Sequence, residues 1–251
     1  MTNWLKFNQS ATPMTNAGDA GPTFGGVIRK LPTALTLVPV IDATASSLAF
    51  SQGIQQVCGD VADALSQTMA DLKLGLHITR DLEFDRDANF SLGEDLKVDE
   101  FKSNLARIVF EGGGDALETQ FDAVQTVART FPWNLVPTAR RAIVLCSSSG
   151  SKLTRDGKDG AGLAQELNAM SIKVIVIAPP GVNLHELAAA TRGASLELTN
   201  TPKLQDIEQV ARMLTRTLTQ MAGSAGNKTM VVPPNTHFGV HGTQVLGVQV
   251  P

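Results

Sequence analysis

The feature that most constrains the fold is an alternation of apolar runs and amphipathic helical patterns that starts near residue 35. Residues 35–41 are nearly all apolar, as expected for a central strand that is buried on both faces. The next segment keeps one apolar face at helical spacing and predicts a helix over 47–72. That face consists of Phe50, Ile54, Val57, Cys58, Val61, Leu65, Met69 and Leu72. The alternation predicts a doubly wound α/β domain, with a mainly parallel central sheet and helices on both faces.

The later elements follow the same alternation. Strands are predicted over 73–81, 142–146, 173–178 and 195–199, with a short edge strand near Phe90, and helices over 98–108, 160–171, 183–191 and 202–221. A further helix is predicted to begin at Asp115 and to place Leu117, Phe121, Val124, Ala128 and Phe131 on its core face. Pro39 lacks the amide hydrogen that a strand donates, so we expect a local bulge or a gap in pairing there.

The chain has 251 residues, 43% of them hydrophobic and 18% charged, which is typical of a globular protein with one large domain. We expect an extended N-terminal arm over 1–26, the domain over 27–221 and a tail over 222–251 with short β-type runs. A net charge of −3 gives no reason to expect nucleic acid as a partner. No apolar run is long enough for a membrane span, and the first residues lack a secretory pattern. Cys58 and Cys146 lie in apolar segments, so we expect buried thiols and a cytoplasmic location.

Three predicted loops follow strands of this sheet and carry polar residues: 42–47, 112–118 and 146–151. Ligands of open parallel sheets bind where the carboxyl ends of the strands meet such loops. Asp42, Thr44 and Ser46 place one carboxylate and two hydroxyls at even spacing directly after the first strand. Hard divalent cations such as Mg²⁺ or Mn²⁺ prefer oxygen ligands, so this loop is chemically suited to one.

The pattern Asp42-Ala43-Thr44-Ala45-Ser46 resembles the metal-ion-dependent adhesion site of von Willebrand factor A (vWA) domains. Other segments resemble bacterial-type members of that family in the same order. They are Thr79-Arg80-Asp81, the loop Gly112-Gly113-Gly114-Asp115-Ala116-Leu117-Glu118, Trp133 with the basic lead-in Arg140-Arg141, and Ala188-Ala189-Ala190-Thr191-Arg192-Gly193-Ala194. The resemblance covers about residues 35–221.

The resemblance implies a non-enzymatic module that binds a protein partner through the loops above the sheet. It implies metal ligands at Asp42, Thr44, Ser46 and Asp115, with an acidic side chain of the partner completing the coordination. It also suggests an AAA+ ATPase, a kinase or a phosphatase as partner, by analogy alone.

One departure weakens the metal site. Many members end the fourth strand in an aspartate, whereas this chain has Ser147, Ser148 and Ser149 there. Removing a carboxylate lowers the affinity for a divalent ion, so we expect the metal to be weakly bound or absent. Ser47 and the three serines would then offer hydrogen bonds to the partner.

Each loop also has a purely structural interpretation. Asp42, Thr44 and Ser46 suit the cap of the following helix, and Asp115 with Glu118 suits a capping box. We prefer the site because three such loops are expected to meet at one edge of one sheet.

Enzyme classes fit less well. The segment Cys146-Ser147-Ser148-Ser149-Gly150 lacks the first glycine of a nucleophile elbow, and no histidine has an obvious role as a base. The triple glycine lacks the lysine and hydroxyl of a phosphate-binding loop, and Asp115 would repel phosphate.

The alternative function is a structural subunit that assembles through its arm and tail, which would pair with sheet edges of other chains. Loss of partner binding on Asp42→Ala favours the interaction module, whereas loss only on trimming the tail favours the structural subunit.

Overall fold

The structure is a computed structural model that describes residues 31–85, 89–114 and 116–223. The predicted arm over 1–26, all but the start of the tail over 222–251, and Asp115 lie outside the described residues. None of the helices in the described part of the chain is long and apolar enough to span a membrane.

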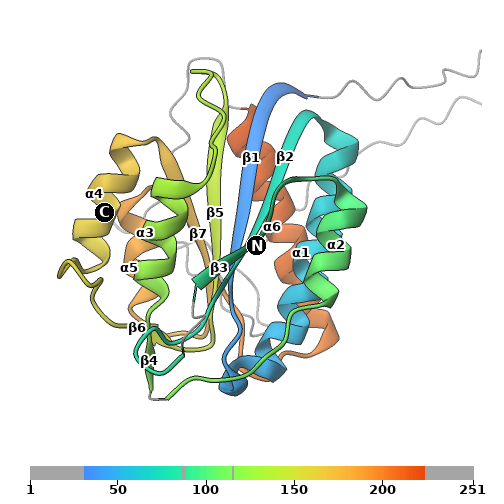
Figure 1. Cartoon of the computed structure of the whole chain (residues 1–251). Coiled ribbons are helices and arrows are strands. Elements are labelled where there is room, and N and C mark those ends of the chain that lie inside the picture. The colour runs from blue at the N-terminus through green and yellow to red at the C-terminus, as the bar shows by residue number, and fades with distance from the viewer. Residues whose placement is uncertain (1–30, 86–88, 115, 224–251) are drawn as a thin grey trace, which may run out of the picture.

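A six-stranded sheet forms the centre of the molecule (Figure 1). Its strands are, in spatial order, β3 (Asn89–Leu96), β2 (Met69–Thr79), β1 (Leu31–Asp42), β5 (Arg140–Cys146), β7 (Ile172–Ala178) and β8 (Ala194–Glu197). All neighbouring pairs are parallel except β2 and β3, which are antiparallel. Strand β3 is the edge strand that was predicted near Phe90. The mainly parallel α/β sheet predicted from the alternation is therefore confirmed.

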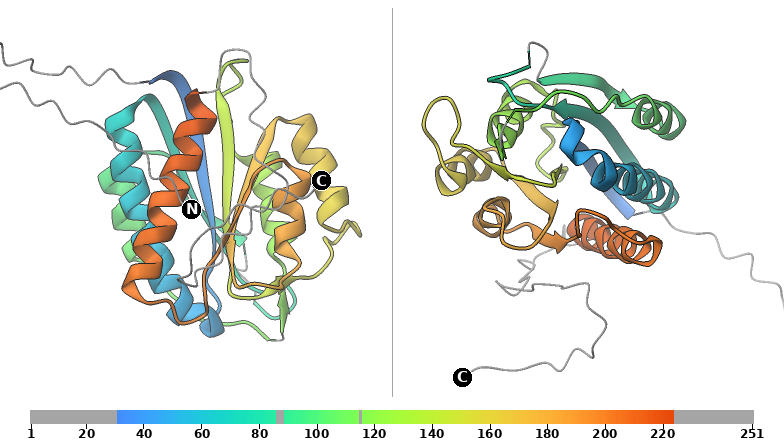
Figure 2. Two further views of the ribbon diagram at one scale, coloured as in Figure 1. Left: turned by 180° about the vertical axis from the view of Figure 1, so that it is seen from behind. Right: turned by 90° about the horizontal axis from the view of Figure 1, so that it is seen from below.

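Helices cover both faces of the sheet, as the two views of Figure 2 show. One layer holds α1 (Leu48–Thr68), α2 (Val98–Ala106) and α6 (Leu204–Gly223), and the other holds α3 (Gln120–Thr130), α4 (Gly160–Ala169) and α5 (Leu184–Ala190). Each layer packs on the sheet through its own apolar core, the first around Phe50 and Phe101 and the second around Phe121. Both predicted buried thiols, Cys58 and Cys146, belong to the first core.

The predicted helix over 47–72 is too long. α1 ends at Thr68, and Met69 already has an extended backbone (φ −98°, ψ 136°) as the first residue of β2. Met69 and Leu72 nevertheless pack in the same core as α1. The apolar pattern continues past the end of the helix because the first residues of β2 contribute to the same core as the buried face of α1.

The helix predicted to begin at Asp115 begins at Gln120 instead. Leu117–Glu118 forms the short strand β4, which pairs in parallel with β6 (Gly150–Ser151). The proposed capping box of Asp115 with Glu118 is therefore wrong, since Glu118 is a strand residue, and Leu117 is 47% exposed rather than in the core. The remaining predicted face of the helix is buried as expected.

Pro39 is accommodated within β1 by a gap in pairing. On the β5 side Pro39 stays in register with Val144, whereas the pairs with β2 stop at Leu37 and resume at Val40 without a shift. Gly75 of β2 lies in this gap, where a Cβ would come within 2.3 Å of the Phe131 ring. Beside the gap in pairing, the Phe131 ring therefore packs directly on the backbone of β2, where only glycine leaves room for it.

The turn after α5 explains one of the vWA-like segments in structural terms. Thr191 Oγ1 accepts a hydrogen bond from the Val174 amide (3.2 Å) and donates to the Leu187 carbonyl (3.0 Å). A Cβ on Gly193 would lie 1.7 Å from the Val174 carbonyl oxygen, so only glycine fits. This segment links α5 to β7 and is not part of the loops at the carboxyl ends of β1 and β5.

His77 of β2 is a buried histidine whose Nε2 atom has no hydrogen-bond partner among the described residues. Burial lowers the pKa of His77 to about 4, and a hydrogen bond with Asn89 only partly offsets this effect. The folded protein therefore holds His77 neutral at a pH where an unfolded chain would protonate it.

We expect the free energy of unfolding to fall by roughly 2 kcal/mol between about pH 7 and pH 5 because of His77. The stability is complete above the unfolded pKa of about 6.5 and is lost progressively toward the folded pKa of about 4. Urea unfolding at the two pH values measures the loss. His77→Gln should remove most of it, whereas the control His185→Gln should keep it; equal losses in both variants would contradict this assignment.

Candidate functional site

The candidate site lies where β1 and β5 end, at the lower edge of the sheet in Figure 1. Ile41 of β1 pairs with Cys146 of β5, so Asp42, the last residue of β1, lies beside Ser147, the first residue after β5. The parallel register thus brings together two loops that are about a hundred residues apart in the sequence.

The Asp42 carboxylate is the centre of the site. It is fully buried, and each of its two oxygens accepts two short hydrogen bonds. Oδ1 accepts from the amide (3.0 Å) and the hydroxyl (2.7 Å) of Thr44. Oδ2 accepts from the hydroxyls of Ser47 and Ser147, both at 2.7 Å. Four donors from three residues therefore stabilise a charge that is removed from water.

Three further hydroxyls form an outer layer. Ser46 Oγ lies 3.2 Å from Thr44 Oγ1, and Ser148 Oγ lies 2.6 Å from Ser47 Oγ. Ser149 donates its amide to Ser147 Oγ (3.2 Å). Ser46 is exposed, and Ser148 and Ser149 are half-buried. Ser46, Ser148 and Ser149 are thus within reach of solvent, whereas Ser47 and Ser147 are fully buried and turned toward Asp42.

These side chains do not cap the following helices. Thr44 and Ser47 occupy the N-cap positions of the 3-10 turn η1 (Ala45–Ser47) and of α1, and neither side chain makes a cap hydrogen bond. Their hydroxyls donate to Asp42 instead. The structure therefore favours the clustered site over the capping interpretation.

Gln120, the first residue of α3, is a member of the site that the sequence analysis missed. Its amide lies 2.9 Å from Ser147 Oγ. In the orientation that satisfies the neighbouring backbone, the amide nitrogen donates to the carbonyls of Glu118 (3.2 Å) and Gly150 (3.1 Å), and the amide oxygen lies beside the Ser147 hydroxyl, whose one hydrogen is donated to Asp42. The wrong helix start hid Gln120, because it placed this residue inside a helix rather than at its first turn.

The glycine loop closes on the same rim. The Glu111 amide donates to the Ala43 carbonyl (3.0 Å), and the Ala45 amide donates to the Gly112 carbonyl (3.3 Å). Gly113 has a φ of +86°, and a Cβ there would lie 3.2 Å from Thr44 Cβ. The backbone therefore approaches Thr44 in a conformation that favours glycine. Asp115 of this loop stays a prediction as a ligand.

The segment Thr79-Arg80-Asp81 supports the rim from the end of β2. The Arg80 guanidinium donates to the Val109 carbonyl (2.9 Å) and pairs with Glu111 (3.2 Å). Asp81 is buried and pairs with Lys152, at 3.1 Å, in the loop after β6. Arg80 and Asp81 therefore hold the neighbouring loops in place.

The hydroxyl oxygens of Thr44 and Ser46 are spaced like two ligands of a divalent ion, but they supply no negative charge to bind it. Two adjacent ligands of an octahedral Mg²⁺ lie about 3.0 Å apart, since each is about 2.1 Å from the ion. The 3.2 Å between Thr44 Oγ1 and Ser46 Oγ is close to that value. In the described part of the chain, however, no group of three or more His, Cys, Asp or Glu side chains that could hold a metal is present. Both oxygens of Asp42, a predicted ligand, already accept hydrogen bonds, so the described side chains would offer a Mg²⁺ or Mn²⁺ ion mainly the neutral hydroxyls of Thr44 and Ser46.

Comparisons with known proteins give a fold but no close relative. The sequence matches no protein-family model, and the comparison with curated proteins finds no match. The VWA domain of SpRpn10 superposes with a TM-score of 0.57 at 11% identity, over 72% of this chain and 95% of that one. Proximal thread matrix protein 1 from the mussel byssus gives 0.55 at 11% identity, over 74% of this chain and 47% of that one.

This chain has a vWA fold. A second structure of the mussel protein, with a zinc-occupied MIDAS motif, matches with a TM-score of 0.56 at 10% identity. The present chain spans about half the length of that protein. The vWA-like domain inferred from the order of motifs is therefore confirmed at the level of fold.

We expect Asp42→Asn to lower the free energy of unfolding by about 2–3 kcal/mol. The new amide group would place a donor, or a neutral acceptor, where hydroxyls now donate to a carboxylate. Urea unfolding measures the change, with Asp71→Asn as the control because Asp71 is an exposed aspartate. If the two variants were equally stable, Asp42 would not be the group that holds these loops together.

Proposed function

We propose that this chain is a non-enzymatic interaction module that binds a protein partner through the loops at the carboxyl ends of β1 and β5. The observation that carries the proposal is the buried Asp42 carboxylate, which orders hydroxyls from both strand ends. Ser46, Ser148 and Ser149 then present ordered oxygen atoms at the surface. Such a preorganised polar centre binds a partner with little further loss of conformational entropy.

Exposed apolar side chains near this polar centre support the proposal. Leu48 is 45% exposed at the start of α1, and Leu117 is 47% exposed in β4. Phe84 is 58% exposed; its ring packs on Gly114 and lies 5.6 Å from the Lys152 ammonium. Aromatic and apolar residues around a few placed polar groups are typical of the buried centre of an interface.

The proposed partner is a protein that presents an acidic side chain. Thr44 and Ser46 would hold a Mg²⁺ or Mn²⁺ ion, and Asp115 is proposed as a further ligand. The ion would supply the positive charge that attracts the partner's carboxylate. An AAA+ ATPase, a kinase or a phosphatase as partner, a cytoplasmic location and a domain spanning 27–221 remain proposals that rest on the sequence.

We expect about 10 mM Mg²⁺ or Mn²⁺ to stabilise the protein modestly. For a dissociation constant of about 1 mM the gain is about 1.4 kcal/mol, or roughly 3–6 °C in Tm. Ser46→Ala removes one ligand and should abolish the shift, whereas Ser91→Ala, which removes an exposed serine of β3, should retain it. A Tm unaffected by either ion would remove the metal from the proposal and leave the partner surface untouched.

The partner surface is tested by site-specific photo-cross-linking in the cell of origin. A photoreactive residue at position 148 should capture a protein that the same residue at position 135 does not. Leu135 is 78% exposed in the loop before β5, at the opposite end of the strands. Capture should be lost when Ser46→Arg is added. Equal capture from both positions, or no capture from position 148, would contradict the proposed surface.

A further inference from the structure

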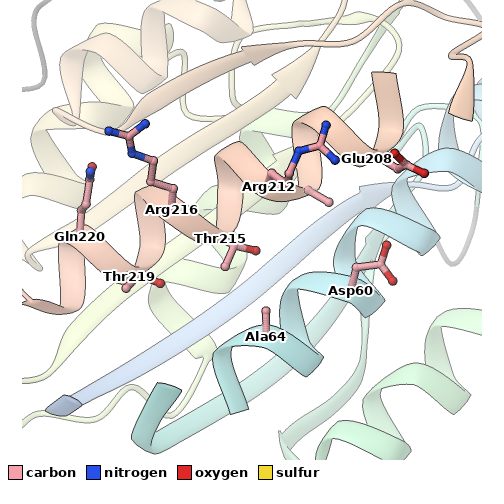
Figure 3. A pocket seen from close by; sticks show the side chains of 9 residues that line it. Asp60, Ala64, Glu208, Arg212, Thr215, Arg216, Thr219 and Gln220 are labelled. Carbon is pink, nitrogen blue, oxygen red and sulfur yellow. Dashed lines mark ion pairs between the residues drawn. The ribbon is translucent and has the colours of Figure 1, made fainter. Parts of the chain in front are cut away.

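A surface groove of about 520 Å³ lies between α1 and α6, away from the site described above (Figure 3). This volume is within the range of roughly 300–1,000 Å³ that is typical of ligand sites. Its walls come from the second half of α1 and from α6 as far as Gln220, three residues before the end of that helix. The groove therefore follows α6 toward the point where the described chain ends.

The floor of the groove is made of small side chains. Ala64 projects from α1 toward α6, and Thr215 and Thr219 point from α6 toward α1. Ala211 adds a further small residue one turn earlier on α6. Small residues on facing helices leave room for a slender occupant such as an extended peptide, and the two threonine hydroxyls can hydrogen-bond with its backbone.

The formal charges of the residues that line the groove sum to zero. Asp60 and Glu208 supply two negative charges, and Arg212 and Arg216 supply two positive charges. Glu208 and Arg212 already lie 3.6 Å apart as an ion pair. A groove whose charges sum to zero attracts neither an acidic nor a basic segment overall, and an uncharged occupant can lie there without breaking the Glu208–Arg212 ion pair.

The 28 residues after Gly223 have the composition that such a groove requires. Lys228 is the one Asp, Glu, Lys or Arg residue among them, so the sequence from Thr229 to Pro251 is free of these side chains. Thr229-Met230-Val231-Val232 is its first apolar run. The N-terminal segment 1–30, in contrast, carries Lys6, Asp19, Arg29 and Lys30.

The length of the chain allows the contact. From Glu208 to Gln220 the groove wall spans about 18 Å, at 1.5 Å per helical residue. Residues 224–228 reach up to about 16 Å when extended, which is enough to reverse direction beside Gln220. Residues 229–232 then cover about 13 Å of the groove, running antiparallel to α6.

We propose that the segment 229–232 of this chain's own tail occupies the groove between α1 and α6. The tail then covers α6 on its outer side and is withheld from contacts with other molecules. This proposal is independent of the metal site and of the partner surface at the opposite end of α1.

Disulfide trapping in the full-length chain tests the proposal. Thr215→Cys with Val231→Cys places one thiol in the groove and one in the tail, and the two native cysteines stay buried. Mild oxidation should form an intrachain disulfide at least about tenfold faster than in the control pair Gln165→Cys with Val231→Cys, because docking raises the effective concentration. Gln165 is exposed on α4, in the other helix layer.

Three outcomes would overturn the proposal. Equal rates in the two pairs would show that the tail samples the surface without docking. A disulfide-linked dimer as the main product would make a second copy of the chain the occupant. Faster trapping of Thr215→Cys by Leu5→Cys than by Val231→Cys would assign the groove to the N-terminal segment.

Labelling of a single groove thiol gives a second test. In the full-length chain, Thr215→Cys should react with a maleimide about tenfold more slowly than the same thiol in a chain that also carries Val231→Asp and Val232→Asp. The Gln165→Cys thiol should react at the same rate with and without the two aspartates. If the Thr215→Cys rate did not change, the tail would not cover the groove.

Discussion

The arrangement of the loops at the carboxyl ends of β1 and β5 depends on one buried charge, the carboxylate of Asp42 at the end of the central strand. Moving a carboxylate out of water costs several kcal/mol unless its oxygens are compensated. The compensation comes from the Thr44 backbone and from hydroxyls of Thr44, Ser47 and Ser147. Because Ser147 belongs to another strand, the need to satisfy Asp42 fixes the two loops to one another.

The serines after β5 interact with Asp42 in a way that a second carboxylate at this position could not. A carboxylate beside Asp42 would repel it unless a cation lay between them. Serine hydroxyls can donate to Asp42 and still accept hydrogen bonds from other groups. Ser147 donates to Asp42 while Ser149 donates its amide to Ser147. Serine at this position therefore allows the two loops to close on one another without a cation between them.

Much of the fold could be predicted from the sequence because strands and helices here differ clearly in period. The overlong first helix shows where this signal fails. Met69 and Leu72 face the core that α1 also faces, so their apolar spacing does not reveal the change from helix to strand. The pairing of β4 with β6 depends on contacts between distant segments, and no local pattern around Leu117 could disclose it.

The sequence predicted most of the residues that gather at the candidate site, but not how their side chains are oriented. The end of β1 and the end of β5 identify Asp42, Thr44, Ser46 and the serines, because parallel strands end at a common edge. The sequence does not show which hydroxyls turn inward, and Ser47 and Ser147 prove to be buried. Gln120 was missed because its place depends on the exact start of α3, and helix starts are the least predictable feature of a sequence.

α1 connects the two surfaces that the proposals concern, and its geometry keeps them apart. Ser47 precedes its first residue at the hydroxyl cluster, and Asp60 lies at the groove with α6. Asp60 lies thirteen positions after Ser47, a distance of about 20 Å along the helix. The cluster uses the buried Ser47, directly before α1, whereas the groove uses side chains in the second half of the helix. A substitution in the groove therefore leaves the Asp42 cluster unchanged, so an effect on both surfaces would have to travel through α1 itself.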